Sequence, residues 1–136
     1  MLDEPEYERW MRSARYTLDS ARHDMEAGFY SWACFKAQQA AEYALKALLW
    51  GVGRPRYGHS LLRLVGEVGG APEDVVEACA RLDKFYTAPR YADAWSEGSP
   101  QDYYTRREAE EAIYYAERVI RFVEERWRSL RRGGGS

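Results

Sequence analysis

The sequence predicts an all-α fold, a single antiparallel bundle of four main helices plus a short one. Apolar residues recur at spacings of three and four along several segments, which is the period of a helix buried on one face. Clusters of glycine and proline separate these segments, and no segment shows the alternation typical of a strand. The chain has 136 residues, 46% of them hydrophobic, which suits one ordinary domain with a real core.

The first predicted helix runs from about Asp3 to Ala27. Asp3 is a favourable N-cap, Pro5 lies where a missing N–H costs little, and Gly28 follows the end. Its predicted apolar face consists of Tyr7, Trp10, Ala14, Leu18, Ala21 and Met25.

The second predicted helix, Ser31 to Trp50, is the most apolar segment. Alanine and leucine favour the helix, and apolar positions surround most of its circumference, so we expect it at the centre of the bundle. Glu42 and Lys46 interrupt this surface four residues apart, with the glutamate first, an orientation that favours an ion pair. The pair is interpreted either as a solvated stripe or as part of a binding site.

A short helix is expected from about Ser60 to Val68, and a fourth from Pro72 to about Thr87, where Glu73 suits the positive end of the helix dipole. The next segment, "APRYADAWSEGSPQDYY", is a connection of roughly 17 residues, long for a structureless loop. Its tryptophan and tyrosines indicate that it packs against the helices.

The last predicted helix begins at Thr105, which forms a T-x-x-E capping box with Glu108, and continues to about Leu130. These elements place one helical domain at residues 7–130 and a flexible tail at 131–136. The longest predicted helices, of about 20–27 residues, span roughly 30–40 Å. They leave more apolar surface than one bundle usually covers, so we expect a homodimer.

Composition narrows the classes of function. A net charge of −2 excludes a uniformly basic nucleic-acid binder, although not a local basic pocket. No apolar run is long enough for a membrane span, and the acidic start "MLDEPEYERW" lacks a signal core. Cys34 and Cys79 lie far apart in apolar contexts and are interpreted as buried thiols of a cytoplasmic protein. The few cysteines and histidines offer no ligand cluster, so no metal and no cofactor are expected.

The stretch "GRPRYGHSLLRL" joins the second helix to the short one. It holds three arginines, a tyrosine and one of only two histidines. Taken alone, it is either a basic turn or a site.

The order of these pieces resembles the HEPN domain family. The resemblance rests on "QQAAEYALKALL", the basic joint with "HSLLRL", and an Arg-Tyr pair in "FYTAPRYADAW" before the last long helix. The family has a motif of an arginine and a histidine separated by four to six residues, and here Arg54 and His59 fit that spacing. The resemblance implies a metal-independent endoribonuclease, often a toxin encoded beside a small nucleotidyltransferase antitoxin. It also implies a homodimer whose two motifs meet in one cleft.

The motif suits RNA cleavage without a metal. Histidine can move a proton off the ribose 2′-hydroxyl or onto the leaving oxygen near neutral pH. Arginine stays charged and can stabilise the phosphate in the transition state. Arg54 and His59 are therefore the candidate catalytic residues, and Arg56 and Tyr57 within the motif are candidates for substrate binding.

The remaining candidates for substrate binding are Glu42, Lys46, Arg90 and Tyr91. Arg90 and Tyr91 match the family's Arg-Tyr element, and the competing interpretation is an arginine stacked on aromatic rings to hold the long loop. One toxin branch carries a tyrosine two residues after the histidine as the target of nucleotidylation, but this chain has Leu61 there. The resemblance therefore does not bring that switch to this chain.

Two other functions stay open. One is a non-catalytic subunit that binds a nucleotide or presents a substrate to a nucleotidyltransferase. The other is a helical assembly module without catalysis.

Overall fold

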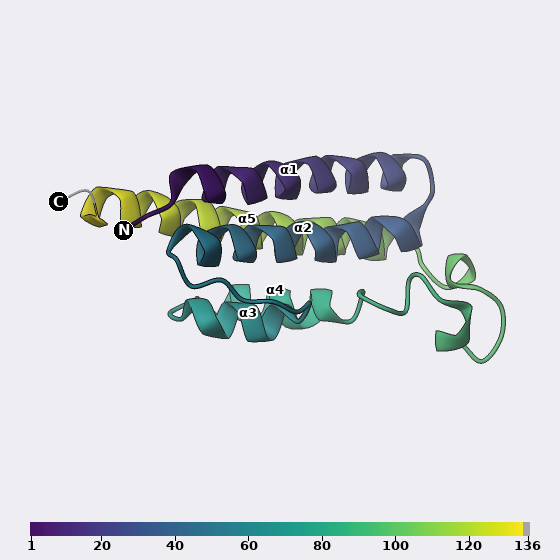
Figure 1. The fold of residues 1–136 in the computed structure, drawn as a ribbon. Helices are drawn as coiled ribbons and strands as arrows, with labels where there is room; N and C mark the ends of the chain where they lie inside the picture. Colours follow the sequence, from purple (N-terminus) through teal and green to yellow (C-terminus); the bar gives the residue numbers. More distant parts are fainter. Residues whose placement is uncertain (135–136) are drawn as a thin grey trace.

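The computed structural model describes residues 1–134 and contains, within them, helices and no strand. Three long helices lie side by side along the bundle: α1 (Glu4–Glu26), α2 (Tyr30–Gly51) and α5 (Arg106–Gly134) (Figure 1). The short helix α3 (Leu61–Val68) packs against α2 and against α4 (Glu73–Asp83), which also contacts α5. Two single-turn 3₁₀ helices, η1 (Ala92–Ala94) and η2 (Pro100–Asp102), lie in the connection to α5. The predicted all-α bundle is confirmed.

The first helix begins and ends close to where the sequence predicts. The side chain of Asp3 accepts a hydrogen bond from the backbone N–H of Glu6 at 3.1 Å, and Gly28 follows the helix with φ +89°. Met11, which the predicted apolar face lacks, is fully buried, whereas Trp10 is only partly buried.

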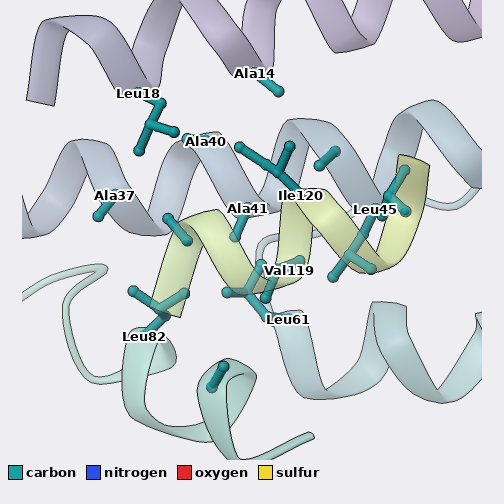
Figure 2. Packing of buried hydrophobic residues seen from close by; sticks show 14 of the residues in the cluster. Ala14, Leu18, Ala37, Ala40, Ala41, Leu45, Leu61, Leu82, Val119 and Ile120 are labelled. Atoms are coloured by element: carbon teal, nitrogen blue, oxygen red, sulfur yellow. The ribbon is translucent and has the colours of Figure 1, made fainter. Parts of the chain in front are cut away.

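The central helix α2 is surrounded because many of its side chains are small. Its alanines are fully buried, and α1, α3, α4 and α5 all contact it. Figure 2 shows side chains of α1, α2 and α5 meeting Leu61 of α3 and Leu82 of α4 in one core. Cys34 and Cys79 are buried free thiols in this core, and burial raises the pKa of each to about 12.

The fourth helix is shorter than predicted, since it ends at Asp83 rather than near Thr87. The N–H groups of Lys84 and Phe85 bond to carbonyls three residues back, which closes the last turn. The chain then turns, and Tyr86 leaves the helix to stack on His59. Tertiary contacts thus override the helical periodicity of this segment.

The long connection packs against itself and the bundle, as predicted. The ring of Trp95 stacks on Tyr103 at 4.2 Å between centroids, and its indole N–H donates to the carbonyl of Ala88.

The capping box at Thr105 and Glu108 is present, and α5 continues through Gly134. Residues 131–134 of the predicted tail are therefore helical, and residues 135–136 lie outside the described part of the chain. Within residues 1–134, no helix combines the length and apolar character that a membrane span needs.

Candidate functional site

A buried polar stripe lies along one face of helix α2. Gln38, Glu42 and Lys46 follow one another at intervals of four residues, so they lie along one face of the helix. All three are buried, with relative exposures of 0%, 3% and 8%. The Nζ of Lys46 donates to the carboxylate of Glu42 at 2.9 Å, and Gln39 also donates to it at 3.3 Å. Of the two interpretations of Glu42 and Lys46, the solvated stripe is wrong because the pair is enclosed by the bundle.

The carboxylate of Glu42 also contacts the ring of His59. The Nδ1 atom of His59 lies 3.2 Å from both carboxylate oxygens. Since a carboxylate can only accept, Nδ1 carries the proton, and a neutral ring is left with its lone pair on Nε2. The side chain of His59 is 54% exposed, in contrast to Glu42 beneath it. A buried carboxylate thus orients an exposed imidazole.

Two further contacts fix the position of His59. Gln38 donates a hydrogen bond to the backbone carbonyl of His59 at 2.9 Å. The imidazole stacks on the ring of Tyr86, with 4.6 Å between centroids and an interplanar angle of 19°. The backbone and the ring of His59 are therefore held from α2 on one side and from the turn after α4 on the other.

Arg90 belongs to the same cluster as His59. Its guanidinium lies over the ring of Tyr86 at 4.7 Å and over the ring of Phe35 at 4.1 Å. Its Nε donates to the carbonyl of Tyr86 at 2.8 Å, and the guanidinium also lies 4.9 Å from the ring of Tyr91. The stacking of Arg90 on aromatic rings, one of the two interpretations from sequence, is present. Arg90 and His59 thus share one neighbour, the ring of Tyr86.

Arg54 lies on a different part of the joint. Its guanidinium donates to the backbone carbonyl of Glu67 near the end of α3. With Arg126 it lines a cleft whose other side chains, Leu48, Leu49, Val52, Val68 and Leu130, are apolar. Within residues 1–134, Arg54 and His59 therefore have different hydrogen-bond partners.

The other two residues of the motif lie on its outer surface. Arg56 forms an ion pair with the carboxylate of Glu67 at 3.3 Å and donates to the carbonyl of Pro55 at 2.9 Å. Tyr57 is 83% exposed, and its ring meets Trp50 edge-on at 5.4 Å between centroids. Both are accessible to a ligand that approaches the joint.

The start of α3 already has its own anionic partner. Asp83 accepts hydrogen bonds from the backbone N–H groups of Leu61 and Leu62, at 2.7 and 3.1 Å, and from the hydroxyl of Ser60. These N–H groups are thus satisfied by the protein. Asp83 also ties the end of α4 to the residue that follows His59.

Sequence reasoning missed three residues of the site: Gln38, Asp83 and Tyr86. The four-residue spacing of Gln38, Glu42 and Lys46 on a nearly continuous apolar helix was a signal for the first of them. Asp83 and Tyr86 contact residues 59–62, which are distant from them in sequence, and the sequence around them carries no comparable signal. In the part of the chain that the structure describes, no group of three or more His, Cys, Asp or Glu side chains is arranged to hold a metal ion.

A comparison with models of known protein families identifies the family of this chain. The model of the HEPN domain family matches residues 7–126, which include every residue of the site. The chain belongs to the HEPN family. No curated protein matches it.

Solved structures agree with this membership. TT1696 from Thermus thermophilus is 45% identical, with a TM-score of 0.86 over 88% of this chain and 96% of its own. ST0689, described as an archaeal HEPN homologue, is 39% identical, with a TM-score of 0.78 over 88% of this chain and 96% of its own. A HEPN domain protein of Thermotoga maritima, tm0613, is 41% identical, with a TM-score of 0.70 over 86% of this chain and 95% of its own. Over most of its length, this HEPN protein therefore shares its fold with stand-alone prokaryotic members of the family.

Proposed function

We propose that this HEPN protein is a metal-independent endoribonuclease in which His59 moves the proton. The observation that carries the proposal is the hydrogen bond between Nδ1 of the exposed His59 and the buried carboxylate of Glu42. It fixes the tautomer that leaves the lone pair on Nε2, and the half-exposed side chain is accessible to a ribose. An imidazole that only filled space would need no buried carboxylate behind it.

The reaction that suits this geometry is a transesterification within RNA. Nε2 of His59 takes the proton of the ribose 2′-hydroxyl while the 2′-oxygen forms a bond to the phosphorus. The bond from phosphorus to the 5′-oxygen breaks, and that oxygen takes a proton from water or from an imidazolium of a second copy. The products are a 2′,3′-cyclic phosphate and a free 5′-hydroxyl, and no oxidant or metal is needed.

Two arginines are candidates for stabilising the charge that gathers on the phosphate. Arg90 lies in the same aromatic cluster as His59, since both side chains contact Tyr86. Arg54 has the family spacing, but its guanidinium is bonded to the carbonyl of Glu67. Arg54 contributes to cleavage if it leaves that carbonyl, or if it meets the His59 of a second copy.

The partners follow from the resemblance to toxin-type members of the family. We propose that a homodimer brings two His59 side chains into one cleft, so that one acts as base and the other as acid. A small nucleotidyltransferase is the proposed antitoxin. Light scattering that shows a strict monomer would contradict the shared cleft.

RNA cleavage by the purified protein tests the proposal. Wild type, His59→Ala, Arg54→Ala and Arg90→Ala are incubated with single-stranded RNA in a chelator. Wild type is expected to cut, and His59→Ala to lose about 10²–10⁴-fold in rate. The arginine variant with the greater loss identifies the phosphate ligand. Intact RNA with wild type, or equal rates for wild type and His59→Ala, overturns the enzymatic proposal.

The bond from Arg54 to Glu67 also favours a second candidate function. If the guanidinium stays on that carbonyl, the joint binds a nucleotide or presents a substrate to a nucleotidyltransferase without cutting RNA. Binding of a nucleotide by wild type, together with intact RNA, is the result that this function predicts.

A further inference from the structure

A basic groove runs along α1 outside the proposed catalytic cluster. Arg9, Arg12 and Arg15 line it together with Tyr16 and Ser13. Arg9, Arg12 and Tyr16 are spaced by three and four residues, so they form one stripe along the helix. The stripe covers about 10 Å of the helix axis.

A second groove, between α1 and α2, continues the first. Tyr16 lines both, and the second is also lined by Lys36, Gln39 and Tyr43 of α2. The α2 residues again share one stripe, and the Nζ of Lys36 bonds across the groove to the hydroxyl of Ser20 at 2.9 Å. The two helices run side by side in Figure 1, and Tyr16 is the residue that the two grooves share.

The second groove ends at the catalytic cluster. Phe35 lines it, and the ring of Phe35 lies 6.1 Å from that of Tyr86, on which His59 stacks. Gln39 also lines it and donates to Glu42, the carboxylate that orients His59. Phe35 and Gln39 therefore connect the second groove to the residues that contact His59.

The charge of this surface is positive. No aspartate or glutamate within residues 1–134 lines either groove. The side chain of Arg12 forms no hydrogen bond or ion pair among the described residues, and Arg9 has only a 3.6 Å pair with Glu6. Arg15 is paired with Glu124 at 3.2 Å, and Lys36 with Asp24 at 2.7 Å, so these two contribute less. Arg12 is the charge most available to a ligand.

The surface also carries an unpaired aromatic ring. Tyr16 is 79% exposed where the two grooves meet, an unusual place for a large side chain that contributes nothing to the core. Bases of a single strand stack on such rings, whereas the bases of a duplex are already stacked on each other. Arginines that bind phosphates beside a tyrosine that stacks a base are the elements of a site for single strands.

We propose that one single-stranded RNA lies along these grooves, with Arg12 on its backbone and Tyr16 on a base, and reaches His59 past Gln39. We name the grooves and these residues the α1–α2 track. The choice of RNA as the ligand of this track rests on the proposed function. It adds that binding residues lie on α1, outside the motif that joins α2 to α3.

Binding of RNA without cleavage tests the track. A fluorescent single-stranded oligoribonucleotide is titrated with His59→Ala, and with His59→Ala combined with Arg12→Ala or Tyr16→Ala, at several salt concentrations. Tyr16→Ala is expected to weaken binding about tenfold. Arg12→Ala is expected to weaken it and to lower the slope of log K against log salt by about 0.7, the value for one phosphate on a single strand.

Matched controls come from the exposed face of α5. Arg107 is 88% exposed and Tyr114 is 59% exposed, and neither lines the grooves. Arg107→Ala and Tyr114→Ala are expected to leave affinity and salt slope unchanged.

Three outcomes overturn the track. The first is that His59→Ala binds no RNA, and the second is that Arg12→Ala and Tyr16→Ala bind like their controls. The third is that these variants change the molecular mass in light scattering but not RNA affinity, which makes the face an interface between copies. If wild type still cleaves RNA in any of these cases, the proposed endoribonuclease function is supported although the α1–α2 track is wrong. If the protein binds RNA along the track but does not cleave it, the track is supported and the endoribonuclease function is wrong.

Discussion

Replacing Glu42 with alanine is expected to lower the free energy of unfolding by about 3–5 kcal/mol and to reduce RNA cleavage at least about a hundredfold. The stability is lost because the amine of Lys46, 8% exposed, loses the carboxylate with which it is paired. The activity is lost because Nδ1 of His59 no longer has an acceptor, so the ring can rotate and change tautomer. Chemical denaturation and a cleavage assay below the unfolding transition measure the two effects separately.

A paired variant separates these roles of Glu42. Glu42→Leu combined with Lys46→Met removes both buried charges and leaves Nδ1 of His59 without an acceptor, and apolar side chains of similar volume often match a buried ion pair in stability. The double variant is expected to recover most of the lost stability but not the cleavage rate. Full recovery of cleavage would show that Glu42 acts only on folding, and the account of His59 would then be wrong.

Replacing Trp127 with alanine is expected to cost about 3–5 kcal/mol, as the loss of a large buried aromatic side chain does. Trp127 is 3% exposed and stacks on Tyr7 with 4.1 Å between centroids and an angle of 3°. Its ring also fills the space above Gly51, where an added Cβ would lie 2.6 Å from it. Trp127 therefore packs α1, α2 and α5 together at the end of α2, where the segment that leads to His59 begins. Urea denaturation measures its contribution to the free energy of unfolding.

The control for Trp127 is Tyr114→Ala on the exposed face of α5. It removes an aromatic side chain that is 59% exposed and is expected to change stability by about 0.5 kcal/mol or less. A similar cost for both substitutions would contradict the assigned packing. Cleavage at low temperature by Trp127→Ala is expected to persist, since Trp127 has no contact with the His59 cluster in the described residues.

The helices could be predicted because their signals are local. Caps such as Asp3 and the box of Thr105 with Glu108 act within one turn, and the structure contains both. The end of α4 could not be predicted in this way. The helical period of the sequence continues to Tyr86, but the stacking of Tyr86 on His59 draws the chain out of the helix, and that contact is distant in sequence.

Some features of the candidate site could be expected from sequence, and others depend on how the helices pack. The joint between α2 and α3 does present His59 to solvent, and the Glu42–Lys46 pair does lie beside it. The direction of Arg54 toward Glu67 depends on how α3 packs, which residue spacing does not encode. Whether Arg54 and His59 act together across two copies stays a prediction.

Analysis of the RNA ends after cleavage tests the central claim most directly. If His59 activates the 2′-hydroxyl, wild type in a chelator leaves 2′,3′-cyclic phosphate and 5′-hydroxyl ends, and His59→Ala cuts about 10²–10⁴-fold more slowly. Ends with a 3′-hydroxyl and a 5′-phosphate, or cleavage by His59→Ala at the rate of wild type, would contradict the account.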